Sequence, residues 1–158
     1  MKKSFQSALL FILTSLSIMS CQFEYAIDNI RLKEKDRPAY ELVQEVFQLM
    51  QKEEVAKLTH LCDVRWNQYE YFDQTIQEGK VILDTYEYPD ETDITVARKM
   101  TYASEFTKEE ITFTLPFKSK VDKDDIIFFH VTVSRGHVQG MVVGKAQEIN
   151  SGLASWDG

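Results

Sequence analysis

Apolar residues in the first half of the body of the chain recur at steps of three and four, which is the spacing of one helix face. The clearest stripe runs from Tyr40 to Met50, and Pro38 stands just before it, where the first turn of a helix tolerates proline. This spacing predicts a helix from Pro38 to about Gln51. Two shorter stripes predict further helices over residues 55–62 and 66–79.

After Gly79, which we expect to cap the third helix, the apolar period changes to two, as is typical of strands. The predicted strands are residues 81–88, 93–102, 110–118, 125–134 and 137–145. Between the last two strands lies Arg135-Gly136, a pair typical of a two-residue hairpin turn in which glycine supplies a positive φ. Such a turn pairs Ser134 with His137, Thr132 with Gln139 and His130 with Met141.

A three-residue loop at residues 122–124 would likewise pair Phe117 with Phe129. Both registers place apolar side chains on one common sheet face, which the helices must cover. The sequence therefore predicts an α+β fold, with N-terminal helices packed on a curved antiparallel β-sheet. The strand residues expected to face the helices are Ile111, Phe113, Leu115, Phe117, Phe129, Val131, Val133 and Val138.

The opposite sheet face is polar near the turn, but four apolar residues are expected on it at the far end: Ile126, Phe128, Met141 and Val143. Exposed apolar patches often mark association, so these four form a candidate partner surface. In the alternative interpretation, the curl of the sheet or the C-terminal tail, with Leu153 and Trp156, covers them.

The N-terminus has the pattern of a secretory signal peptide. Lys2 and Lys3 are followed by an apolar run of about 12 residues, shorter than the about 20 that span a bilayer. The run ends in Ile18-Met19-Ser20-Cys21, which resembles the lipobox of bacterial lipoproteins.

That resemblance implies cleavage before Cys21, a diacylglycerol on its thiol and an acyl chain on its amine, which together anchor the protein to a membrane. Gln22 follows instead of an aspartate, which by analogy favours the outer membrane. An ordinary signal peptide that leaves Cys21 as a free thiol is the alternative, although Ile18 matches its cleavage pattern poorly. The expected organisation is a signal peptide (1–20), a lipidated N-terminus and tether with a short ordered piece around Tyr25 to Ile30 (21–36), a globular domain (37–148) and a tail (149–158).

Helices followed by a bent antiparallel sheet over residues 38–146 resemble the nuclear transport factor two-like, or cystatin-like roll, superfamily. The resemblance is one of architecture and implies a cone-shaped sheet around a cavity that binds small molecules or, in some members, carries catalysis.

Charge and composition narrow the possible functions. The 158-residue chain has a formal charge of −7, and residues 1–20 carry two lysines and no acid, so their removal changes the charge to −9. An acidic chain is a poor nucleic-acid ligand, so we expect no nucleic-acid partner. Cys62 would be the only cysteine left in the body, and we expect it in the core. We expect neither a cofactor nor a metal, because His130 and His137 would lie about 13 Å apart on one face.

Three functions remain open. The first is an envelope lipoprotein that acts as a binding module for a protein partner or an apolar small ligand. The second is an enzyme with its active site in a cone-shaped cavity, and the third is a structural accessory subunit of an envelope complex. The predicted helix-facing strand residues carry no group that transfers protons, which favours binding. The candidates for an acid or base are then Tyr40, Tyr69, Asp84, Tyr86 and Glu87.

Overall fold

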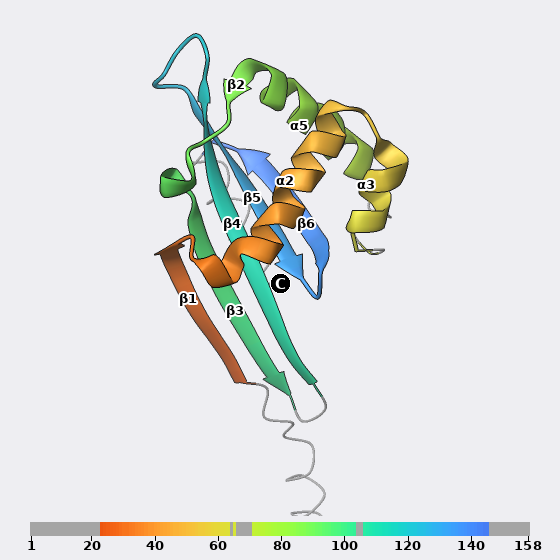
Figure 1. The fold of residues 1–158 in the computed structure, drawn as a ribbon, viewed down its shortest axis with the longest axis vertical. Helices are drawn as coiled ribbons and strands as arrows, with labels where there is room; N and C mark the ends of the chain where they lie inside the picture. Colours follow the sequence, from red (N-terminus) through yellow and green to blue (C-terminus); the bar gives the residue numbers. More distant parts are fainter. Residues whose placement is uncertain (1–22, 64, 66–70, 104–105, 146–158) are drawn as a thin grey trace, which may run out of the picture.

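The computed structural model describes residues 23–63, 65, 71–103 and 106–145. Within these residues, three α-helices pack against a six-stranded antiparallel sheet that is not closed, which confirms the predicted α+β class (Figure 1). The helices are α2 (Arg37–Gln51), α3 (Val55–Leu61) and α5 (Phe72–Thr85), and the strands are β1 (Phe23–Arg31), β2 (Tyr86–Glu87), β3 (Thr95–Ala103), β4 (Phe106–Ser119), β5 (Ile126–Ser134) and β6 (His137–Gly144).

The strands lie in the order β1-β3-β4-β5-β6, and β2 pairs with β4. Strand β1 occupies most of the segment expected to be a tether, and the ordered piece expected around Tyr25 to Ile30 is part of this longer strand. It pairs with β3 from Phe23 opposite Tyr102 to Arg31 opposite Thr95, so the sheet begins well before the helices.

The prediction for α2 is confirmed, because this helix runs from Arg37 to Gln51 with proline in its first turn. The expected end of the third helix at Gly79 is wrong, and so is most of the strand expected over residues 81–88. Helix α5 continues to Thr85, and only Tyr86–Glu87 form a strand. Its buried positions, Phe72, Ile76, Gly79 and Leu83, keep helical spacing throughout.

Gly79 serves helix packing instead of a cap. A Cβ at this position would overlap the Cε of Met50 on α2 and would lie 3.5 Å from Cε1 of Phe129. The absence of a side chain therefore lets α5 approach both α2 and the sheet closely.

The register between β4 and β5 differs from the expected one by two residues. Phe117 pairs with Ile127, and Leu115 pairs with Phe129. The loop is longer than expected because its polar groups form local hydrogen bonds: the Ser119 amide donates to the Asp125 carbonyl (3.0 Å), and the Asp125 amide donates to the Asp122 carbonyl (3.1 Å). A shift of two residues keeps each side chain on its face, so the face assignment is correct although the pairing is not.

The hairpin turn between β5 and β6 is confirmed. Arg135 and Gly136 have φ values of 52° and 74°, and Ser134 pairs with His137. The register then shifts between Thr132 and Val133, so that Met141 pairs with Val131 instead of with His130. This irregularity reverses the faces of the remaining residues of β6.

The core fills the space between α2 and the sheet with aromatic rings. The ring of Phe47 on α2 lies 5.1 Å from that of Phe129 and 5.8 Å from that of Phe117, in edge-to-face geometry. The strand residues expected to face the helices are buried, except that Ile111 packs against the core while partly exposed.

Candidate binding cleft

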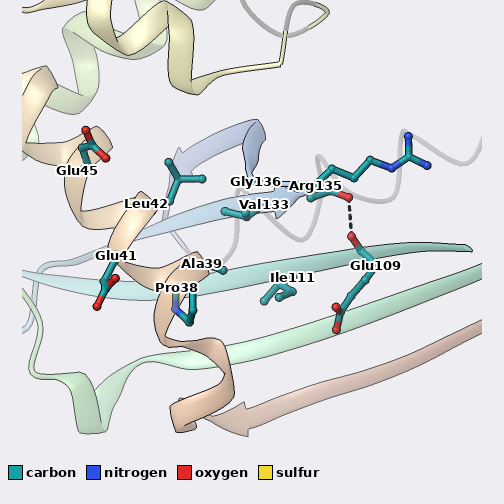
Figure 2. A pocket seen from close by; sticks show the side chains of 11 residues that line it. Pro38, Ala39, Glu41, Leu42, Glu45, Glu109, Ile111, Val133, Arg135 and Gly136 are labelled. Atoms are coloured by element: carbon teal, nitrogen blue, oxygen red, sulfur yellow. Dashed lines mark hydrogen bonds between the residues drawn. The ribbon is translucent and has the colours of Figure 1, made fainter.

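A cleft of about 670 Å³ opens between the first half of α2 and the sheet, beside the turn that joins β5 and β6 (Figure 2). Ala39 and Leu42 of α2 line one side, and Ile111 of β4 and Val133 of β5 line the other. The charged residues of the lining are three glutamates and one arginine: Glu41, Glu45, Glu109 and Arg135.

A buried ion pair fixes the helix side of the cleft. Asp36, immediately before α2, is fully buried, and its carboxylate pairs with the Arg98 guanidinium on β3. The Lys33 amide donates to the other carboxylate oxygen of Asp36 at 2.9 Å. Arg98 also pairs with Glu109 at the edge of the cleft. These contacts tie the start of α2 to the two strands that lie beneath it.

The turn fixes the opposite side. The Ser134 hydroxyl, which is almost completely buried, donates a hydrogen bond of 2.5 Å to the carbonyl of Glu109. This bond, the dashed line in Figure 2, joins β5 to β4 where the cleft opens. The side chain of Arg135 extends away from α2 in that view. Backbone and buried contacts therefore hold both walls in place.

The rim of the cleft is negative. Glu45 has no ion-pair partner among the described residues. The nearby Arg37 is engaged elsewhere, because both of its terminal nitrogens bind the Glu91 carboxylate, at 2.7 and 3.1 Å. That hydrogen-bonded pairing raises the pKa of Arg37 and lowers the pKa of Glu91. Glu109 is paired with Arg98, so Glu41 and Glu45 on α2 are the cleft carboxylates that can attract a cation from outside.

Tyr40, Tyr88 and Cys62 are titratable groups in or beside the core, and each has a raised pKa. The hydroxyls of Tyr40 and Tyr88 lie 3.3 Å apart, and burial is the main cause that raises the pKa of each. Burial also raises the pKa of the Cys62 thiol to about 12. All three groups therefore keep their protons at neutral pH and are poorly suited to acid–base chemistry.

The acid or base candidates from the sequence do not come together. Asp84 is exposed, Glu87 pairs with Lys123 at 2.7 Å, and the Tyr86 hydroxyl donates to Asp125 at 2.6 Å. Tyr69 lies outside the described residues.

None of the three histidines belongs to the cleft lining, although His137 follows it directly in the chain. His130 contacts the Thr114 hydroxyl at 3.0 Å, and burial lowers its pKa. His137 contacts the Arg135 carbonyl at 3.1 Å, and His60 is exposed on α3. Across the described part of the chain, no three His, Cys, Asp or Glu side chains are grouped so that they could share a metal ion.

The predicted partner surface of Ile126, Phe128, Met141 and Val143 does not form, because the register shift in β6 divides it. Met141 is buried opposite Val131, and Val143 pairs with Phe129 and packs against the core. Ile126 and Phe128 remain on the other face and are half-buried. Val138 and Met141 are apolar residues three apart in a strand with Gly140 between them, and this spacing was the available sign of a bulge.

The cleft itself was not predicted. Glu41 and Glu45, four apart on α2, gave a sign of one acidic helix face, but nothing in the sequence joined them to Glu109 or Ile111 on β4.

The lipidation candidate Cys21 and the tail residues Leu153 and Trp156 lie outside the described residues. None of the described helices is both long and apolar enough to cross a membrane. Comparison with protein-family models, curated proteins and solved structures found no match to this chain.

Proposed function

We propose that the protein is an envelope lipoprotein, anchored to the outer membrane through Cys21, and that it acts as a binding module. The signal-peptide pattern and the lipobox-like Ile18-Met19-Ser20-Cys21 support the anchor. The cleft between α2 and the sheet is the proposed binding site.

The observation that carries the binding role is the acidic rim above an apolar floor. Leu42, Ile111 and Val133 offer carbon surface, and Glu41 and Glu45 on α2 favour a positively charged group next to it. A purely apolar small ligand would gain nothing from the carboxylates. The cleft therefore fits a basic segment of a protein partner that also carries an apolar side chain. The acidic mature chain would speed the encounter with such a partner.

The anchor is tested by the mass of the protein isolated from its host. We expect a chain that begins at Cys21 and carries acyl groups, and we expect Cys21→Ser to be released from membranes by washing. A chain that keeps its first methionine and is unacylated would overturn the anchor.

The cleft is tested by photo-crosslinking in native envelopes. A benzophenone amino acid at Leu42 should crosslink one partner protein, whereas the same group at Val121, which is 96% exposed on the β4–β5 loop, should not. The charge-reversed variant Glu41→Lys/Glu45→Lys should reduce the Leu42 product several-fold. Equal crosslinking from both positions, or a product indifferent to the charge reversal, would overturn the cleft as the binding site.

A further inference from the structure

One end of the sheet extends past the helix layer. In Figure 1, β1, β3 and β4 continue beyond the start of α2. The register identifies the residues at this end: Phe23 opens β1 opposite Tyr102, and Ala103 of β3 pairs with Phe106 of β4. The N-terminal end of β1 and the adjoining ends of β3 and β4 therefore lie together.

Two aromatic side chains are exposed at this sheet end. Tyr102 is 42% and Phe106 is 48% exposed. Tyr102 pairs with Thr107, whereas Phe106 pairs with Ala103, so the two rings leave the sheet on opposite faces. Tyrosine is enriched where a bilayer meets water, and phenylalanine is typical of surfaces that enter the boundary between headgroups and acyl chains.

The sheet end is also close in the chain to the proposed anchor. Phe23 is two residues from Cys21, so the backbone separates them by at most about 7 Å. An acylated Cys21 lies at the membrane surface, and Phe23, the first described residue after it, pairs with Tyr102. The opposite end of the sheet, with the β4–β5 loop, is distant, because β4 has 14 residues and spans about 45 Å.

Resting on the proposed lipid anchor, we propose that Tyr102 and Phe106 form a membrane-docking surface whose partner is the headgroup–acyl boundary of the lipid bilayer. Two exposed rings on opposite faces suit the entry of a sheet end, and their position beside the anchor places them at the bilayer. The protein then stands on the membrane with its strands directed away from it, and the β4–β5 loop is the part farthest from the lipid.

The test uses the full acylated chain in phosphatidylcholine vesicles, with an environment-sensitive fluorophore on a cysteine introduced as Tyr102→Cys or, separately, Phe106→Cys. Val121→Cys on the distant loop is the matched control. Acylation occupies the thiol of Cys21, and Cys62 is buried, so the introduced thiol is the one labelled; the unsubstituted chain measures the background. A quencher carried on the lipid reports contact with the bilayer.

We expect the labels at 102 and 106 to gain intensity several-fold and shift to the blue on the vesicles, and the lipid-borne quencher to reduce their emission. The label at 121 should show neither effect. Labels at 102 and 106 as water-exposed as the label at 121, on a chain whose mass shows acylation, would overturn the docking surface and leave the anchor standing. A blue shift without quenching would assign these rings to a second copy of the chain and would also overturn the proposal. An unacylated Cys21 would overturn the anchor and the docking surface together.

Discussion

Asp36 is an acidic residue at the start of α2, but its side chain does not cap that helix. Its carboxylate makes no capping hydrogen bond to α2 and instead accepts from the Lys33 amide and pairs with Arg98. Burying a charge costs free energy unless the charge is paired. The position of α2 on β3 therefore depends on the pairing of Asp36 with the Arg98 guanidinium. The edge of the cleft depends on the same guanidinium, because Arg98 also pairs with Glu109.

We expect Arg98→Met to lower the free energy of unfolding by about 3–5 kcal/mol, because it leaves the Asp36 carboxylate buried without a positively charged partner. Urea denaturation followed by circular dichroism measures the change. Lys118→Met, which breaks the exposed pair with Asp93, should cost less than about 1 kcal/mol.

The double variant Asp36→Asn/Arg98→Met should recover part of the lost stability, because no buried charge remains unpaired. If Arg98→Met costs no more than Lys118→Met, the pairing of Asp36 with Arg98 does not hold the start of α2.

At the scale of elements, the molecule depends on how closely α5 approaches α2 and β5. Gly79 lies at this approach, in contact range of Met50 and Phe129. A glycine near the end of an apolar stripe is ordinarily a sign of a helix end, and here it is a packing position within a longer helix. The position of Gly79 within the helix also shortens the first predicted strand, since residues 81–85 are helix instead of strand.

Gly79→Leu should lower the free energy of unfolding by about 1–3 kcal/mol, because a branched side chain cannot fit between Met50 and Phe129 without displacing them. Gln77→Leu, at an exposed position of the same helix, is the matched control and should change stability by less than about 0.5 kcal/mol. Thermal unfolding of the two variants compares them. A Gly79→Leu protein as stable as the control would show that α5 does not pack at residue 79 as described.

At the scale of the whole molecule, the acidic cleft and the exposed aromatic rings lie at different places on the sheet. The described part places the acidic cleft beside the β5–β6 turn and two exposed aromatic rings at the end of the sheet that adjoins Cys21 in the sequence. Under the two proposals, the bilayer meets the sheet end and a basic partner meets the cleft. If residues 1–20 are removed as proposed, the charge of −9 on the remaining chain favours that encounter.

The crosslink from Leu42 should therefore depend on salt. Raising NaCl from about 0.1 M to about 1 M shortens the Debye length from about 10 Å to about 3 Å, and we expect the yield to fall several-fold. The variant Glu41→Gln/Glu45→Gln should start from a lower yield and lose less of it. A yield that is unchanged by salt in the unsubstituted chain would mean that apolar contact alone binds the partner.

The sequence by itself determined the fold class, the extent of α2, the turn at Arg135-Gly136 and the faces on which residues 111–118 of β4 lie. These features depend on local periodicity and on backbone conformations that few residues adopt. Residues close together in the sequence determine both. The tertiary structure decided the pairing of Leu115 with Phe129, the shift that buries Met141, the packing role of Gly79 and the place of β1 in the sheet. It alone decided the cleft, because Glu41 and Glu109 are far apart in the chain and line one cleft only where α2 packs on the sheet. A strand can slip by two residues without changing its apolar face, and a helix can cross a sheet at several places with the same stripe buried, so local pattern leaves these choices to packing.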